Sequence, residues 1–370
     1  MSSVASTPQP AAPDLETVWF TAGDGMPLNL IHARGDKPAT RGPVLVVHGA
    51  GVRANLFRPP SGRTIVDALL ADGYDVWLEN WRASIDLPHN RWTLDQAALH
   101  DHPQAVATVV RETGASTIQA VIHCQGSTSF MMSAVAGLVP QVRTIVSNAV
   151  SLHPVVPAVA RLKGLLSVPA VARLTDYLDP QWGLHAPTPA AKLISALVAL
   201  THHECDNPVC KQVSFTYGVG FPTLWSHANL DAATHDWIRR EFAQVPMTFF
   251  QQMQRCLGAG HLVAAERLPG LPSDYLAQPP RTEARIAFFA GQDNRCFLAR
   301  SQELSFAYFD RLQPGRHSLK VLPGYGHLDV FLGRHAARDV FPHMLAALGD
   351  PPAAASADTG GVPAGAAACL

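Results

Sequence analysis

Cysteine is scarce in this chain, and its six residues are scattered along 370 positions. Such sparse usage excludes a disulfide scaffold and makes a reducing cytoplasm the default location. Charged residues are also few, at 15%, and the 28 basic side chains nearly balance the 29 acidic ones. No long block of one sign occurs, which argues against a nucleic-acid partner or an anionic membrane surface. The 47% hydrophobic content is high for a soluble protein and fits either an enzyme with an apolar pocket under a lid or a well-filled core.

Three further features are missing. No run of about 18 uninterrupted apolar residues occurs, so we expect no membrane-spanning helix. The chain starts without a basic segment followed by an apolar one, and we expect no secretory signal. Neither a Gly-x-Gly-x-x-Gly loop nor a phosphate-binding loop is present, so we expect no nucleotide or other cofactor.

Composition divides the chain into five parts. Residues 1–13 and 350–370 are rich in Ala, Pro, Gly and Ser, which predicts disordered ends. Residues 14–150 and 281–349 alternate strand patterns with helical ones, and this alternation predicts a mostly parallel central sheet with helices on both faces. Residues 151–280 are punctuated by proline and mostly helical in pattern. We expect this insertion to form a lid over the carboxyl ends of the strands.

The most informative stretch is VIHCQGSTSF, in which a strand pattern gives way abruptly to a helix pattern. Such a sharp turn holds one side chain above the sheet, beside backbone N–H groups. That side chain is Cys124, with Gly126 two residues later but Ile122 where the full motif has glycine. A helix N-terminus favours a thiolate, so Cys124 is the candidate nucleophile. A buried structural cysteine at a tight turn is the alternative.

An oxyanion-stabilising loop is predicted by VLVVHGAGVRANLF, where His48 and Gly49 follow a buried strand. Backbone N–H groups of Ala50 and Gln125 are expected to converge on the negative charge that develops during acyl transfer. The glycines also fit any tight loop, so this prediction depends on the turn at Cys124.

Two partners for the nucleophile occur late in the chain. In GQDNRCF, Asp293 follows a strand pattern, and in GYGHLDVF, His327 lies in a loop after the next strand. The order Cys124, Asp293, His327 is typical of a nucleophile, acid and histidine on this kind of sheet. We expect His327 to deprotonate the thiol and Asp293 to orient the imidazole.

The chain resembles the α/β-hydrolase family, and within it the acid-lipase-like branch. It is most similar to the hydrolase modules associated with cholesterol-oxidase-like flavoenzymes. The stretches that carry the resemblance span most of residues 40–345 and are HGAGVRANLF, WRASIDLP with WTLDQAALHDHP, HCQGSTSFMMSAVAGL, GQDNRCFL and GYGHLDVFLGRHAARDVFP. The resemblance implies an α/β-hydrolase fold.

Cysteine in place of serine is the main departure from that branch. Acid lipases carry a His-Ser-Gln-Gly turn, whereas this chain has His123-Cys124-Gln125-Gly126. Polyhydroxyalkanoate synthases, a second resemblance, use cysteine in a lipase-like box, but their oxyanion loop and lid differ from those expected here.

These residues predict an esterase, lipase or thioesterase that forms an acyl-thioester intermediate on Cys124. Expected substrate contacts are His48 and Gly49 in the oxyanion loop and Trp225 and Phe250 in the lid. An acyltransferase with the same triad is one alternative, because a thioester also reacts with alcohols. A non-catalytic protein that binds apolar ligands on a hydrolase fold is the other.

One cluster does not belong to this chemistry. THHECDNPVC places His202, His203, Cys205 and Cys210 within nine residues. Adjacent histidines seldom both reach one ion, and the spacing matches no familiar zinc finger. We therefore expect no metal site; a Cys205–Cys210 disulfide and ordinary lid structure are the alternatives.

Overall fold

A computed structural model describes residues 13–219 and 223–349. Apart from Pro13, the two segments predicted to be disordered, 1–13 and 350–370, lie outside the described residues. No helix in the described part is both long and apolar enough to cross a bilayer.

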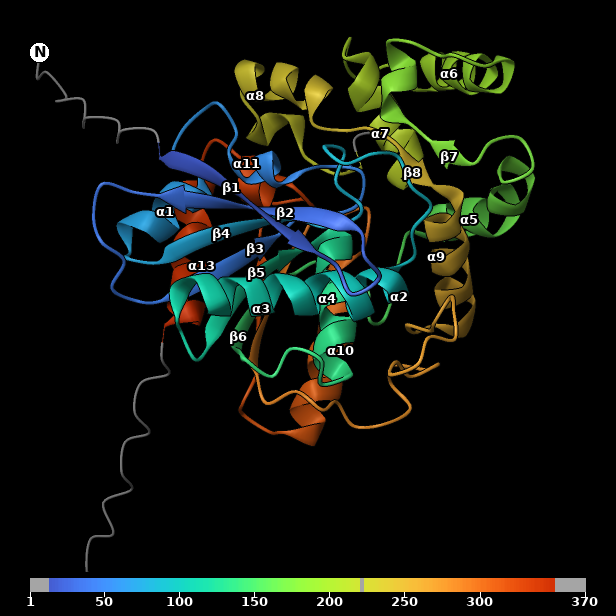
Figure 1. Cartoon of the computed structure of the whole chain (residues 1–370). Helices are drawn as coiled ribbons and strands as arrows, with labels where there is room; N and C mark the ends of the chain where they lie inside the picture. The colour runs from blue at the N-terminus through green and yellow to red at the C-terminus, as the bar shows by residue number, and fades with distance from the viewer. Residues whose placement is uncertain (1–12, 220–222, 350–370) are drawn as a thin grey trace, which may run out of the picture.

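A central sheet of eight strands organises the molecule (Figure 1). The strands are β1 (Asp14–Thr21), β2 (Pro27–Arg34), β3 (Pro43–Val47), β4 (Asp75–Asn80), β5 (Ile118–His123), β6 (Val142–Asn148), β9 (Arg285–Gly291) and β10 (Ser318–Leu322). Their order is β1-β2-β4-β3-β5-β6-β9-β10. The pairs β1–β2 and β2–β4 are antiparallel and the others are parallel, which confirms the predicted, mostly parallel sheet.

The burial of each strand matches its place at the centre or the edge of the sheet. Every residue of β3 and β5 is buried, because both faces of the sheet are covered at its centre, and β3 is accordingly a continuous apolar run. At the sheet edge, β1 leaves most of its residues exposed and pairs with β2 through a hairpin. The hairpin turns at residues 23–25, and Gly25 takes a φ of 90° that suits glycine.

Helices of the sheet domain cover both faces. They are α1 (Ile65–Ala71), α2 (Leu94–Gln96), α3 (His102–Thr113), α4 (Cys124–Val135), α10 (Ala299–Leu312), α11 (Asp329–Leu332), α12 (Ala336–Asp339) and α13 (Phe341–Leu348). Helix α3 packs on α4 and on β3 and β5, whereas α1 packs on α13. In Figure 1, α3 crosses in front of the sheet and α13 lies behind it.

An insertion between β6 and β9 stands beside one end of the sheet (Figure 1). Its elements are α5 (Ala158–Val171), β7 (Tyr177–Leu178), α6 (Pro189–Thr201), α7 (Pro208–Tyr217), α8 (Ala232–Trp237), β8 (Val245–Pro246) and α9 (Met247–Ala259). The insertion has a small core of its own around Trp182 and Val198. Its α5 and α6 also expose several leucines, including Leu166 and Leu200. Part of the 47% hydrophobic content therefore lies on the surface of the insertion.

Candidate active site

Cys124 lies at a sharp turn between β5 and α4. Its φ is 56°, a left-handed value that non-glycine residues adopt only where the surrounding structure enforces it. A Cβ on Gly126 would lie 2.0 Å from the carbonyl oxygen of His48, and one on Gly49 would lie 2.9 Å from the Cβ of Cys124. Both glycines are therefore needed for the oxyanion loop to pass close to the turn.

Cys124 is only 7% exposed. Burial raises its pKa to about 12, and hydrogen bonds from the backbone amides of Gln125 and Ala50 offset only part of this effect. Both amides predicted to form the oxyanion hole thus point at the sulfur itself. At neutral pH the resting thiol is protonated.

Neighbouring side chains hold the oxyanion loop in place. The hydroxyl of Tyr217 donates to the carbonyl of Ala50 at 2.8 Å, and the indole of Trp81 donates to the carbonyl of His48 at 2.9 Å. The ring of His48 is fully buried and does not line the cavity beside Cys124. His48 therefore contributes its backbone to the site, whereas we had expected a substrate contact.

His327 lies in the loop between β10 and α11, and a ring nitrogen lies within 4.8 Å of the Cys124 sulfur. The ring is 1% exposed, and its Nε2 has no hydrogen-bond partner among the described residues. Burial lowers the pKa of His327 to about 3, so the imidazole is neutral at ordinary pH. His123 packs against it with ring centroids 4.8 Å apart.

Asn294, rather than Asp293, is hydrogen-bonded to His327. The Nδ2 of Asn294 lies 3.0 Å from the Nδ1 of His327. Its Oδ1 accepts from the backbone N–H groups of Cys296 at 2.9 Å and Phe297 at 3.1 Å. Because the oxygen is engaged by two donors, the NH₂ group faces the histidine. His327 therefore accepts at Nδ1, and its single proton is on Nε2.

The predicted role of Asp293 is not supported by its position. Its side chain is exposed, and its backbone N–H donates to the carbonyl of Tyr325. Successive side chains diverge in the turn after β9, so only the next residue reaches the histidine. Asp329, which follows His327 closely, instead accepts from the backbone of Gly326 and the amide of Asn229.

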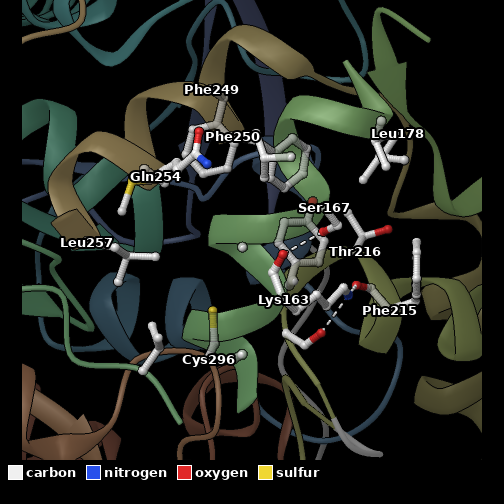
Figure 2. A pocket seen from close by; sticks show the side chains of 18 of the residues that line it. Lys163, Ser167, Leu178, Phe215, Thr216, Phe249, Phe250, Gln254, Leu257 and Cys296 are labelled. Atoms are coloured by element: carbon white, nitrogen blue, oxygen red, sulfur yellow. Dashed lines mark hydrogen bonds between the residues drawn. The ribbon is translucent and has the colours of Figure 1, made fainter. Parts of the chain in front are cut away.

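An apolar cavity of about 130 Å³, partly open to solvent, lies at Cys124. Helices α5, α7 and α9 of the insertion supply most of its wall (Figure 2). Its apolar lining includes Val168, Leu178, Phe215, Phe249, Phe250 and Leu257. Among the residues that the structure describes, none that lines the cavity is acidic. The cavity is therefore suited to a hydrocarbon chain next to the thiol.

One cation, Lys163, lies in this lining. Its ammonium donates to the backbone carbonyls of Phe215 and Gly218 and lies 4.0 Å from the centre of the Phe215 ring. Burial lowers the pKa of Lys163 to about 8. The cavity wall is thus charged at neutral pH and becomes uncharged in mild alkali.

The two lid aromatics chosen from the sequence differ in position. Phe250 lines the cavity (Figure 2). Trp225 does not; it is 3% exposed and packs against Phe242 in the core. A large aromatic side chain in the insertion can pack in its core or line the substrate cavity, and the sequence alone does not distinguish these two positions.

Sequence reasoning missed Asn294, Lys163 and Tyr217. Asn294 had a usable signal, because it follows Asp293 directly in the turn after a strand. Lys163 and Tyr217 had none, since each acts through contacts between distant segments.

No family model matches the chain. A sterol esterase of Saccharomyces cerevisiae is 25% identical over 167 residues, which covers 38% of this chain and 31% of the esterase. The chain thus matches about a third of the length of that relative. A soluble variant of a Saccharomyces cerevisiae monoglyceride lipase, solved with a substrate analogue, has a TM-score of 0.53 at 13% identity, covering 94% of this chain and 98% of the lipase.

A monoacylglycerol lipase of Paleococcus ferrophilus has a TM-score of 0.51 at 11% identity, covering 90% of this chain and 98% of that structure. Likenesses at such low identity concern the backbone alone. Together with the order and direction of the strands, they establish that this chain has the α/β-hydrolase fold.

Proposed function

We propose that the protein hydrolyses a carboxylic ester, lactone or thioester of an apolar substrate, with Cys124 as the nucleophile. The observation that carries the proposal is the position of the Cys124 sulfur. It lies at a left-handed turn, receives two backbone N–H groups, has His327 within 4.8 Å and opens into an apolar cavity. A structural cysteine would need none of these features.

In the proposed reaction the substrate carbonyl oxygen replaces the sulfur as acceptor of the Ala50 and Gln125 N–H groups. The sulfur attacks the carbonyl carbon, the thiol proton passes to Nε2 of His327, and the leaving alcohol or thiol takes that proton as its bond breaks. Water then attacks the carbonyl carbon of the thioester and gives a proton to His327. The bond from this carbon to sulfur breaks, which releases the acid, and the sulfur takes the proton from His327 to reform the thiol.

The resting tautomer of His327 opposes the first proton transfer. Its Nε2 carries the proton, so the base function requires the proton on Nδ1 instead. Asn294 can accept from Nδ1–H only by turning its amide over and releasing the amides of Cys296 and Phe297. We therefore expect a slow hydrolase in which this rearrangement forms part of the barrier.

Helices α5, α7 and α9 would act as the lid and select the acyl chain, because they form the cavity wall opposite Cys124. The fold relatives named as lipases support an apolar ester as substrate. The apolar cavity, in which no described lining residue is acidic, supports it further.

A panel of p-nitrophenyl esters of increasing chain length tests the proposal. We expect turnover that is abolished by prior treatment with iodoacetamide at about pH 9–10, where enough thiolate forms to be alkylated, together with an acyl mass adduct on the Cys124 peptide. The absence of both turnover and adduct would favour the non-catalytic, ligand-binding alternative. Alcohol added as a competing acceptor reports transfer: ester product in place of free acid would favour an acyltransferase.

A further inference from the structure

Four sulfur and nitrogen ligands converge in the insertion, away from the candidate active site. Cys205, Cys210, His227 and His235 each offer one atom, and these atoms lie within 4.8 Å of one another. Two of the four belong to the cluster noted in the sequence, but the two histidines come from later segments. From this convergence we propose that these four side chains bind one zinc ion with structural function.

The separation between one pair of ligand atoms fits tetrahedral zinc. Zn–S bonds of about 2.3 Å and Zn–N bonds of about 2.0 Å place neighbouring ligand atoms roughly 3.3–3.8 Å apart. The Sγ of Cys210 and Nε2 of His227 are 3.4 Å apart. The imidazole rings of His227 and His235 cross at 82° with centroids 4.8 Å apart, so the two side chains are direct neighbours. Two thiolates balance the charge of Zn²⁺, and the two imidazoles are neutral. The half-buried site would therefore carry no net charge.

The state of these side chains also points to a ligand. Cys205 and Cys210 are both free thiols, so the disulfide alternative is not formed in this structure. The Nε2 of His235 is buried and has no hydrogen-bond partner among the described residues. A zinc ion bound there would satisfy that nitrogen and hold both sulfurs.

The surrounding residues position the ligands before any metal binds. The Oδ1 of Asn207 accepts from the backbone of Val209 and Cys210, which starts α7 and places Cys210 in its first turn. The Nδ2 of the same Asn207 donates to the carbonyl of His235 at 2.8 Å. Asp231 caps α8 and so places His235 within that short helix. Such partners orient metal ligands and raise affinity.

His202 and His203 do not take part. The Nδ1 of His202 lies 2.9 Å from the hydroxyl of Thr201, and the Nε2 of His203 lies 2.7 Å from the carbonyl of Leu200. The expectation that no metal binds here considered only residues 202–210, and it was right that the adjacent histidines do not both reach one ion. It did not consider His227 and His235, which are 17 and 25 residues after Cys210 in the chain.

The site joins the cavity wall to the loop of His327. Helix α7 begins at the site and ends at Phe215–Tyr217, which line the cavity. Just before His227, the carbonyl of Leu224 accepts from the backbone of Leu328, the residue after His327. Zinc would therefore fix α7 relative to the histidine loop, in the upper part of Figure 1 where α7 and α8 lie.

Metal analysis of the full chain tests the proposal. Protein produced with added zinc and purified with a reductant but no chelator is expected to carry about one zinc ion per chain. Cys205→Ser and Cys210→Ser should each lower this content to less than about a tenth. His203→Ala, which alters an exposed neighbour outside the cluster, is the matched control and should keep the zinc.

A second measurement remains informative if the cysteine variants fail to fold. Wild-type protein stripped with a chelator and reloaded with Co²⁺ should show the visible bands and thiolate charge-transfer absorption of tetrahedral cobalt. A wild type with no stoichiometric zinc and no such spectrum would overturn the proposal. So would a Cys205–Cys210 disulfide in the reductant-purified protein, or loss of zinc in His203→Ala. Zinc content is read directly and does not depend on the role of Cys124.

Discussion

Asn294 donates its amide N–H to Nδ1 of His327 at 3.0 Å, where an acid that accepts from the histidine was expected. The two partners place the proton of the imidazole on different ring nitrogens. An acidic partner holds the proton on Nδ1 and leaves Nε2 free to act as a base, whereas the donating amide holds the proton on Nε2. A cysteine nucleophile tolerates this better than a serine, because a thiol gives up its proton more readily than a hydroxyl.

Replacing Asn294 with aspartate should restore the usual tautomer. The carboxylate can accept from Cys296 and Phe297 at one oxygen and from His327 Nδ1–H at the other. We expect kcat/KM to rise about tenfold or more, measured with a short p-nitrophenyl ester. Asp293→Asn, at the exposed neighbouring position, is the control and should have wild-type kinetics. The reverse pattern would assign the orienting role to Asp293 after all.

Removing the thiol should remove turnover. Cys124→Ala is expected to lower kcat by several orders of magnitude while the thermal unfolding temperature stays near that of the wild type. Cys124→Ser should keep the fold and retain at most weak activity, because the resting tautomer of His327 activates a hydroxyl poorly. Cys256→Ala, which removes another buried free thiol outside the cavity lining, controls for packing. Full activity in Cys124→Ala would refute the assignment.

The thiol and the imidazole should titrate far from neutrality. Burial puts the pKa of Cys124 at about 12, so alkylation of its peptide by iodoacetamide should rise about tenfold per pH unit between pH 7 and pH 10. A plateau near pH 8 would instead indicate a thiolate that forms at neutral pH.

The lowered pKa of His327, about 3, bears on the acid limb of the rate profile. Its imidazole stays neutral as the pH falls from 7 to 5, so kcat/KM should be flat over that range wherever the protein remains folded. Circular dichroism at each pH serves as the folding control. Loss of kcat/KM with a midpoint near pH 6.5 in folded protein would contradict the buried, neutral histidine.

Lys163 should make chain-length preference depend on pH. Its pKa of about 8 means that the cavity wall carries a positive charge below pH 8 and is neutral above it. KM for a long-chain ester should therefore fall between pH 7 and pH 9, because an alkyl chain no longer contacts an ammonium group. KM for an acetyl ester should change little. In Lys163→Met the pH dependence of the long-chain KM should disappear; its persistence would exclude Lys163 as the cause.

Substitution of Phe250 should change chain-length preference, whereas substitution of Trp225 should change the stability of the fold. Phe250→Ala widens the cavity and should shift the optimum toward longer or bulkier acyl chains, with acetyl ester turnover within a few-fold of the wild type. Trp225→Ala should leave the chain-length profile unchanged and lower the free energy of unfolding by about 3–5 kcal/mol, because it empties a core position. Denaturant titration and the ester panel measure the two effects. A changed profile in Trp225→Ala alone would reverse these roles.

The sequence by itself determined the sheet, the insertion and the turn at Cys124. The buried strand β3 is a continuous apolar run, and the sharp turn needs glycine at position 126, so both are visible in neighbouring residues. Cys124 and His327 could be selected from the sequence because each follows a recognisable strand pattern, in the order usual for this kind of sheet.

Only the tertiary structure decided which side chains meet. Asp293 and Asn294 are adjacent in sequence, and the course of the turn after β9 brings Asn294 to the histidine. Likewise, His227 and His235 reach Cys210 because Asn207 ties α7 to α8, a contact between residues 28 positions apart. Periodicity depends on neighbours along the chain, whereas such convergence depends on the packing of distant segments, which no local pattern records.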